Sequence, residues 1–319
     1  MAAGWTSRSH IEDVWDALEK WALPLLGDRD VAEITANADI VAVLQQPAID
    51  SRGAVLGPLW TTRTTTADRT RNHIRSILDW AAAAEYRPKG LHNPAQWANN
   101  LDRVLAAPAR VPPVRNHPAL DYRRIPALWA QLAGYTGSSA DALRFTILTA
   151  SRINETAKAR RDEVDNDPEF GLTWRLPAGR MKGRRPHRQP LSTQVGQLLE
   201  RLPTEANNPY LFIGLRAGTA ITDSAIRMCL RRLDGGYAEQ TVVHGLRSTF
   251  RDWAAERTSY AREIAELALA HRIGDDDTER AYLRSDLFEK RRRLLQSWSD
   301  YCTTPVAPSR TVTAIGAGR

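Results

Sequence analysis

Apolar residues recur at intervals of three and four through much of the first hundred residues. Between residues 8 and 25, behind Ser9 in a capping position, the apolar positions are Ile11, Val14, Trp15, Leu18 and Trp21. Residues 37–46 continue the pattern, and the clearest case is 65–86, with an apolar stripe at Ile74, Ile77, Leu78 and Ala81. A period close to 3.6 residues predicts amphipathic helices that each turn one face to a core. Another helix is expected to begin within 93–105, which makes this part an all-α domain.

The helical pattern stops in a proline-rich stretch, AAPARVPPVRNHPALDYRRIP, at residues 106–126. Proline donates no backbone hydrogen bond and restricts the residue before it, so an ordered element is not expected here. We interpret the stretch as a linker at 108–124 that joins the helical domain, 1–107, to a larger one at 125–302. The alternative is a long surface loop within one domain.

The second part of the chain mixes two periodicities. Helical spacing returns at 127–132 and 139–161, and again from about 193 to 299. Between them, apolar residues alternate on both sides of a Gly- and Arg-rich centre at 172–192. Alternation predicts a β-hairpin, and the tip of the hairpin carries Lys182, Arg184 and Arg185. The expected fold class is therefore mainly α with a small β-hairpin or sheet, an α+β domain after an all-α one.

Composition narrows the class of partner. The 319 residues carry 44 Lys and Arg against 37 Asp and Glu, a net charge of +7 with a pI near 9.7. This balance favours a polyanionic partner, nucleic acid first, or else reflects an unspecialised basic surface. The two cysteines, Cys229 and Cys302, form no CxxC pair, so neither a disulfide framework nor a zinc site is predicted. No apolar run approaches about 20 residues, which argues against a membrane span.

A histidine and an arginine lie three apart in TVVHGLRSTFRDWAAE, residues 241–256. If a helix begins at Gly245, His244 caps it and Arg247 lies one turn in, on the same face. The apolar positions form a separate stripe that would anchor the helix in a core: Leu246, Phe250 and Trp253. A helix start attracts an anion, and arginine binds phosphate through two donors. The pair suggests a phosphate site, the alternative being a solvated surface pair.

A second arginine lies in FTILTASRINETAKARRDEVD, residues 145–165. Arg152 is followed three residues later by Glu155. The carboxylate would orient the guanidinium, or the two form an ordinary ion pair.

These stretches resemble the tyrosine recombinases, in particular the integrases of temperate phages and genomic islands. The resembling pieces follow in family order: LTASRINETAKARRDEVD, WRLPAGRMKGRRPHRQPLS, HGLRSTFRDWAAE, LALAH and AYLRSDLFEKRRRLLQSWSDYC. They cover roughly residues 120–302, and the N-terminal part resembles the family's core-binding domain through weaker motifs. The resemblance implies a core-binding, DNA-binding domain at 1–107, a catalytic domain at 125–302 and a flexible tail at 303–319.

The resemblance also implies a site-specific DNA recombinase, an integrase that integrates or excises a mobile element. Tyr282 would attack the DNA phosphorus and form a covalent 3′-phosphotyrosine. Arg152 and Arg247 would hold the non-bridging oxygens, with Glu155 in support. A family enzyme of this kind needs no metal, ATP or other cofactor.

The remaining members of the family's catalytic set match a lysine and two histidines. Lys182 at the hairpin tip would protonate the leaving 5′ oxygen as a general acid. His244 would accept the proton of the phenol, and His271 would hydrogen-bond the phosphate.

The implied partner is double-stranded DNA at an attachment-site core, bound by a tetramer on two duplexes. Accessory excision factors or host DNA-bending factors are further partners that the family implies, and no membrane partner is expected. The expected location is the bacterial cytoplasm. The sequence starts at the first helix expected of the core-binding domain, so the usual N-terminal arm-binding domain is expected to be absent, in a short variant or a trimmed chain. Phosphate contacts are expected from six arginines: Arg63, Arg69, Arg71, Arg75, Arg184 and Arg185.

Two other functions fit parts of the pattern. A DNA-binding protein that only assembles at its site would need no catalytic set, and the complete set argues against it. A type IB topoisomerase-like enzyme would share the chemistry but relax DNA, and the short linker and compact size favour recombination instead.

Overall fold

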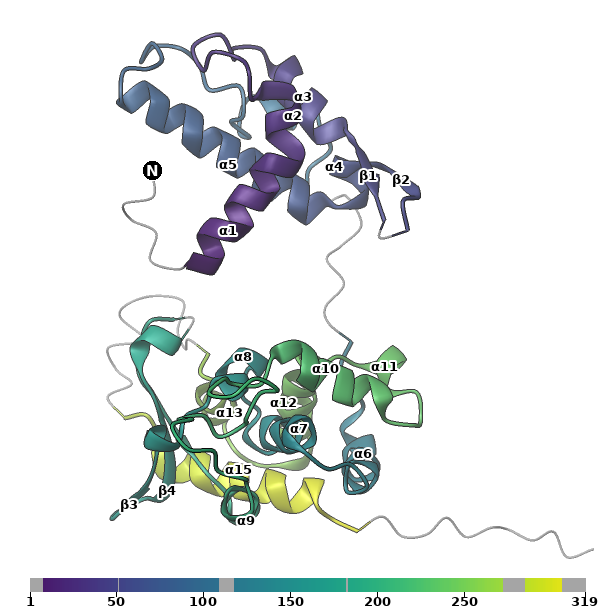
Figure 1. Ribbon diagram of the computed structural model, residues 1–319, viewed down its shortest axis with the longest axis vertical. Coiled ribbons are helices and arrows are strands. Elements are labelled where there is room, and N and C mark those ends of the chain that lie inside the picture. Colours follow the sequence, from purple (N-terminus) through teal and green to yellow (C-terminus); the bar gives the residue numbers. More distant parts are fainter. Residues whose placement is uncertain (1–7, 51, 109–117, 182, 272–284, 306–319) are drawn as a thin grey trace, which may run out of the picture. The chain divides into compact units, whose positions relative to one another are not determined.

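The computed structural model describes residues 8–50, 52–108, 118–181, 183–271 and 285–305, in two compact units (Figure 1). Unit 1 is Met1–Arg115 and unit 2 is Asn116–Arg319. Each unit has its own cluster of buried apolar side chains.

Unit 1 is helical with one small hairpin. Its helical elements are α1 (Arg8–Ala17), a π-helical turn (Leu18–Ala22), α2 (Leu23–Leu26), α3 (Asn37–Gln45), α4 (Leu59–Thr62), α5 (Thr64–Ala83) and a 3₁₀ turn (Leu101–Arg103). The strands β1 (Pro47–Ile49) and β2 (Val55–Pro58) pair antiparallel. The helices predicted at 8–25, 37–46 and 65–86 are confirmed, but the expectation of an all-α domain is wrong because of this hairpin.

The helix predicted within 93–105 is also wrong, because the chain there forms turns and a single 3₁₀ turn. Asparagine side chains bind the backbone in place of a helical ladder. Asn93 accepts from the backbone N–H of Ala95 at 3.0 Å, and Asn100 donates to the carbonyl of Pro94 at 3.1 Å. Asn99 has φ 58°, a left-handed conformation that ends any helix.

The core of unit 1 follows the apolar stripe of α5. Ile74, Leu78 and Ala81 are at most 4% exposed, as the periodicity predicts. Trp60 is buried and donates its indole N–H to the carbonyl of Ala106 at 2.9 Å. Trp15, predicted on the apolar stripe of the first helix, is instead 56% exposed.

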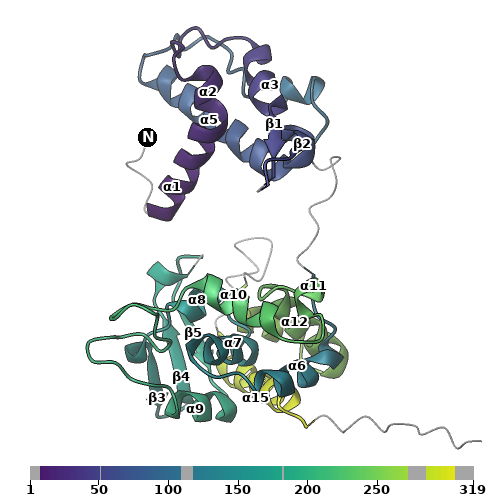
Figure 2. The same cartoon turned by 45° about the vertical axis from the view of Figure 1, so that its right-hand side comes forward.

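Unit 2 packs its helices around α7, beside a three-stranded sheet (Figures 1 and 2). The helices are α6 (Ile125–Leu132), α7 (Ser138–Thr149), α8 (Ile153–Ala157), α9 (Thr193–Glu200), α10 (Asp223–Arg232), α11 (Tyr237–Gln240), α12 (Gly245–Arg257), α13 (Arg262–Ala268) and α15 (Phe288–Cys302). The antiparallel strands are β3 (Val164–Asp167), β4 (Gly171–Leu176) and β5 (His187–Pro190). The predicted hairpin is confirmed as β4 and β5, and β3 adds a polar strand, VDND, that alternation does not predict.

The helix expected over 139–161 is broken. Ala150 closes α7 in a left-handed conformation, φ 48°, and Arg152 is extended before α8 begins. The backbone N–H of Arg152 donates to the side chain of Glu155 at 2.9 Å, which caps α8. The break therefore places Arg152 at the start of α8 and leaves the carbonyl of Ala150 available to a donor from elsewhere in the chain.

Residues 118–124, expected to be linker, are part of unit 2. Leu120 and Tyr122 are at most 5% exposed. Thr249 of α12 donates to the carbonyl of Leu120 at 2.7 Å, and the hydroxyl of Tyr122 donates to Glu256 at 2.9 Å. This segment thus fixes α12, which carries Arg247.

Gly245→Ala is expected to lower the free energy of unfolding by about 1–3 kcal/mol. A Cβ at Gly245 would lie 2.0 Å from the carbonyl oxygen of Pro118, so backbone would have to move. Chemical denaturation measures the loss. Gly196→Ala in α9 is the control, because its Cβ would meet only the side chain of Leu172 at 3.5 Å. Equal stability of the two variants would contradict the tight contact.

Candidate active site

Arg247 is a buried guanidinium held between two helix ends. The apolar stripe of α12 is buried as predicted, at Leu246, Phe250 and Trp253, but Arg247 itself is only 5% exposed. It donates to the carbonyl of Ala150 after α7 and to that of Leu269 after α13, the latter at 2.6 Å. The C-terminal ends of helices carry partial negative charge, which favours a cation there.

No carboxylate bonds this guanidinium directly within the described residues. The partners of Arg247 are two carbonyl oxygens and the Nε2 of His271 at 3.3 Å. Burial, reinforced by the charge of Arg152 and opposed by those of Glu155 and Glu266, lowers the pKa of Arg247 to about 10, so it stays charged at neutral pH. Burying a charge is costly, and an incoming anion that bonds the guanidinium would relieve part of that cost.

Arg152 is oriented by Glu155, as one of the two predicted alternatives has it. The guanidinium donates to Glu155 at 2.8 Å, and the carboxylate is also the cap of α8. The side chain of Glu155 is 8% exposed and that of Arg152 is 23% exposed. Arg152 also reaches the carbonyl of Ala270 at 3.5 Å. The pair is therefore more constrained than an exposed i,i+3 ion pair, and the guanidinium keeps a solvent-accessible side.

His271 follows α13 and is held by an acidic residue. Its Nδ1 lies 2.6 Å from Glu266, and its Nε2 faces Arg247. Because a guanidinium only donates, Nε2 is the acceptor and Nδ1 carries the proton toward Glu266. Burial lowers the pKa of His271 against the opposing hydrogen bond from Glu266, so the ring is neutral near pH 7.

A small recess lies between Arg247 and the sheet. Its lining includes Glu155, Arg247 and Ala270, together with His187 and Gln189 of β5.

The two β5 side chains were missed in the sequence. The Nε2 of His187 lies 2.7 Å from Gln189, which donates to the carbonyl of Thr149 at 2.8 Å. Burial lowers the pKa of His187 to about 4, so it is neutral near pH 7. The alternation of side chains along a strand could have identified them. Residues 187 and 189 lie on the same face of β5, opposite Leu176 and the buried Trp174 on β4.

Arg180 was also missed in the sequence, and it fixes the segment between β4 and β5. It donates to the backbone carbonyl of Glu155 at 2.6 Å and pairs with the buried Glu163. Trp174 donates to the same Glu163 at 3.1 Å. The chain two residues before Lys182 is thus tied to α8.

Of the other predicted site residues, three are exposed and two lie outside the described residues. His244 is the N-cap of α12, as predicted, and is exposed, while Arg247 is buried. Arg184 and Arg185 are exposed on the arm that leads to β5. Lys182 and Tyr282 lie outside the described residues.

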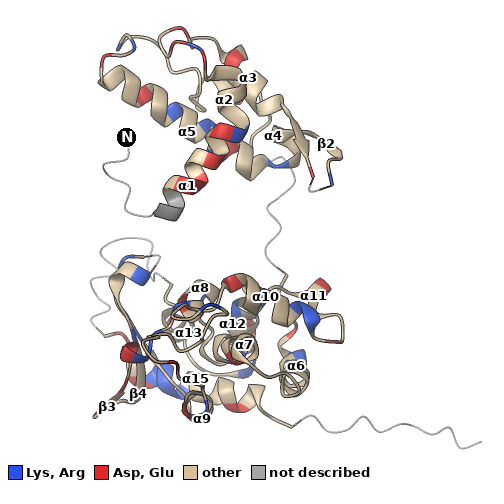
Figure 3. Cartoon of the chain, in the orientation of Figure 1, with Lys and Arg blue, Asp and Glu red and all other residues tan. Residues whose placement is uncertain are grey.

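The arginines predicted to contact DNA from unit 1 divide into two kinds. Arg69 and Arg75 are exposed on α5, whose basic positions Figure 3 marks. Arg63 is half-buried and donates to the carbonyl of Ile49 in β1 at 2.7 Å.

Arg71 corrects the prediction, since it is 5% exposed. It donates to Asp68 at 2.8 Å and to the carbonyl of Ala95 at 2.9 Å, and lies over the ring of Trp97. A guanidinium with these internal partners cannot also reach a phosphate.

Sequence comparison places the chain among known proteins. The phage integrase central domain family matches residues 1–100. Prophage integrase IntZ of Escherichia coli (strain K12) is 31% identical over 301 residues, which are 93% of this chain and 67% of IntZ. The chain belongs to the phage integrase family of tyrosine recombinases. Prophage integrase IntA of the same strain is 28% identical over 298 residues, 92% of this chain and 65% of IntA. The chain thus spans about two thirds of these relatives' length.

Solved structures share the fold of this chain. A lambda integrase (75-356) dimer bound to a COC′ core site matches with a TM-score of 0.59 at 12% identity, over 89% of this chain and 91% of that one. At this identity the likeness shows the fold. The expected fold class is confirmed, with the hairpin of unit 1 as its one correction.

The described residues lack two features. In those parts of the chain, no helix combines the length and the apolar character needed to cross a membrane. Nor do three or more His, Cys, Asp or Glu gather among them in a way that could hold a metal ion.

Proposed function

We propose that this chain is a site-specific DNA recombinase that integrates or excises a mobile element through a covalent 3′-phosphotyrosine at Tyr282. The observation that carries the proposal is the pair of guanidiniums, Arg152 and Arg247, beside the neutral imidazole of His271. Arg247 is buried and bonds no carboxylate among the described residues. A DNA phosphodiester supplies an anion that both guanidiniums can bind.

In the proposed reaction Arg152 and Arg247 hold the two non-bridging oxygens. The phenol oxygen of Tyr282 attacks phosphorus, and its proton passes to His244. The bond from phosphorus to the 5′ oxygen breaks, and Lys182 donates a proton to that oxygen. The free 5′ hydroxyl of another strand then attacks the phosphotyrosine, which restores the phenol and rejoins DNA without ATP.

Electrostatic stabilisation provides most of the catalytic effect in this scheme. Charge grows on the non-bridging oxygens as the phosphorus becomes five-coordinate. Donors that are already fixed need no reorganisation at that moment, and one such donor is worth about 3–4 kcal/mol. The carbonyls behind Arg247 and the carboxylate of Glu155 hold the guanidiniums in place before DNA arrives.

The two units have separate roles in this proposal. Unit 1 is the core-binding domain and contacts phosphates through Arg69 and Arg75, while unit 2 cleaves. Phosphate contacts position a protein without reading sequence. The proposed assembly is a tetramer on two duplexes carrying the attachment-site core, with accessory excision or DNA-bending factors, in the bacterial cytoplasm.

Variants of α5 separate structural arginines from phosphate contacts. Arg71→Ala should lower the free energy of unfolding by about 1–3 kcal/mol, because buried partners lose their donor. Arg69→Ala and Arg75→Ala should leave the melting temperature unchanged and each reduce the slope of log affinity against log salt by about 1. Unchanged slopes for both would remove α5 from the DNA interface.

The test of the function is covalent capture. Duplexes bound by the wild-type protein are enriched from a randomised library, and the selected sequence is synthesised with a nick placed at each position in turn. This nicked core duplex releases a short strand on cleavage, which traps the intermediate. We expect a protein–DNA adduct that survives SDS and forms in EDTA. Binding without an adduct at any nick position would instead support a protein that only assembles on DNA.

A further inference from the structure

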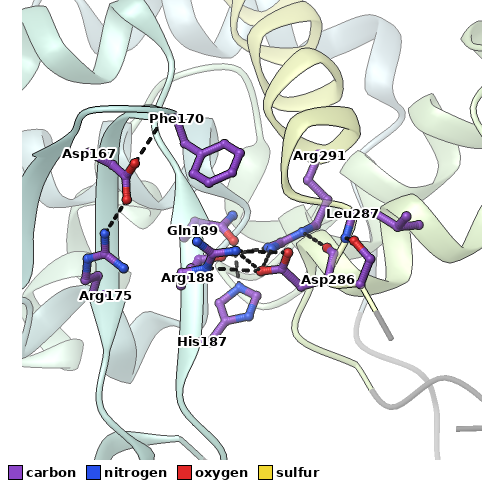
Figure 4. Close-up of polar contacts among 10 residues, drawn as sticks. Asp167, Phe170, Arg175, His187, Arg188, Gln189, Asp286, Leu287 and Arg291 are labelled. Atoms are coloured by element: carbon purple, nitrogen blue, oxygen red, sulfur yellow. Dashed lines mark hydrogen bonds and ion pairs between the residues drawn. The ribbon is translucent and has the colours of Figure 1, made fainter. Parts of the chain in front are cut away.

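Three charged side chains join β5 to the start of α15 (Figure 4). Arg188 donates to both carboxylate oxygens of Asp286, at 3.1 and 3.0 Å from Nη2 and at 3.2 Å from Nε. Arg291 donates to the same carboxylate at 2.9 Å. We call Arg188, Asp286 and Arg291 the Asp286 clamp.

The clamp holds backbone as well as side chains. The Nε of Arg291 donates to the carbonyl of Asp286 at 2.7 Å, and its Nη1 donates to the carbonyl of Arg188 at 2.7 Å. The side chain of Arg291 is 1% exposed, and this burial lowers its pKa to about 10, so it remains charged. One buried guanidinium therefore fixes a strand and a helix start to each other.

Aromatic rings cover one side of the clamp. The guanidinium of Arg188 lies 4.7 Å from the ring centre of Phe288 and 5.3 Å from that of Phe170. The two rings are 5.0 Å apart. Stacking of a planar guanidinium on such rings restricts it to one orientation.

The clamp links a strand that lines the recess to the chain just downstream of the predicted nucleophile. His187, the residue before Arg188, lines the recess with Arg247. Tyr282 precedes Asp286 by four positions and follows His271 by eleven. Of these two described residues, Asp286 is the nearer to Tyr282 along the chain.

We propose that Arg188 and Asp286 are positioning residues for the nucleophile, because they fix the chain just downstream of Tyr282 to the strand that lines the recess. The inference rests on the proposed function. It assigns the clamp a role in the attack of the phenol on phosphorus, and none in DNA affinity.

The expected effects on stability and on cleavage rate separate this role from a purely structural one. The side chains of Arg188 and Asp286 are 36% and 40% exposed, and exposed ion pairs add about 0–1 kcal/mol to stability. A displacement of about 1 Å at a reacting group can cost about 100-fold in rate. The clamp is therefore expected to matter more for cleavage than for folding.

The first experiment compares Arg188→Ala, Arg188→Lys and a control in single-turnover cleavage of the nicked core duplex. Arg175→Ala is the matched control, because Arg175 of β4 is 42% exposed and also pairs with acidic residues, Asp165 and Asp167. We expect Arg188→Ala to slow adduct formation about 10- to 100-fold. Arg188→Lys, which keeps the charge but not the two-pronged contact, should be intermediate, and Arg175→Ala should match the wild type. DNA affinity and melting temperature should be unchanged in all three.

A second duplex tells nucleophile positioning from an effect on the leaving group. It carries sulfur in place of the bridging 5′ oxygen, so the leaving thiolate needs no proton. Arg188→Ala should stay slow with this duplex relative to the wild type. Three outcomes would each overturn the proposal. The first is full recovery of the Arg188→Ala rate on the sulfur-substituted duplex, and the second is a wild-type rate of Arg188→Ala on the nicked core duplex. The third is a rate loss that is explained by a lower melting temperature. Failure of the wild type to form any adduct would overturn the proposed function, and this inference with it.

Discussion

We expect Tyr282→Phe to abolish the covalent adduct on the nicked core duplex and to leave DNA affinity unchanged. The substitution removes one oxygen atom, the one that would bond to phosphorus. No neighbouring group can replace it in a linkage that survives SDS, so the loss is complete rather than partial. Denaturing gel electrophoresis measures the adduct, and a gel shift measures binding.

A second tyrosine supplies the control. Tyr301, in α15, is half-buried against Trp253 and Trp298, and its hydroxyl donates to the carbonyl of Tyr122 at 3.3 Å. Tyr301→Phe should form the adduct at the wild-type rate. An adduct that persists in Tyr282→Phe, or disappears in Tyr301→Phe, would show that the nucleophile is misassigned.

Arg247→Ala is expected to slow adduct formation about 100- to 1,000-fold, the cost of one lost donor to a developing oxyanion. It also leaves the carbonyls of Ala150 and Leu269 without their donor, which destabilises the fold by about 1–3 kcal/mol. Single-turnover cleavage and chemical denaturation measure the two effects separately. Arg247→Lys keeps a positive charge but cannot reach both carbonyls and an anion together, so most of the rate loss should remain.

The control for Arg247 lies on the same helix. Arg257 is exposed at the last position of α12, and Arg257→Ala should change neither the cleavage rate nor the stability. If Arg247→Ala lost stability but cleaved normally when assayed well below its melting temperature, Arg247 would be a structural arginine only.

The site has an electrostatic arrangement that these experiments probe. Two helices end in left-handed alanines, Ala150 with φ 48° and Ala270 with φ 50°. Each ending turns carbonyl oxygens toward the guanidiniums of Arg152 and Arg247. Carbonyls hold Arg247 through partial charges, whereas Arg152 is also paired with the carboxylate of Glu155. Such a site holds arginine firmly and still attracts a phosphate.

The local pattern of the sequence determined most of the helices and their buried faces. The stripes of α5 and α12 are buried where the period of 3.6 residues places them, because the apolar side of a helix is encoded within a few turns. The resemblance of five motifs in order identified the family, and with it the residue types that this chemistry requires.

Tertiary structure alone decided how those residues are held. Arg247 and Ala150 are 97 positions apart, and Arg188 and Asp286 are 98 apart, so no local pattern reports either contact. Arg69 and Arg71 look alike in the sequence, yet only the second meets the carbonyl of Ala95 and is buried. Periodicity records which side of an element faces a core, whereas the partner of a charged side chain depends on which distant backbone groups the packed fold leaves unpaired.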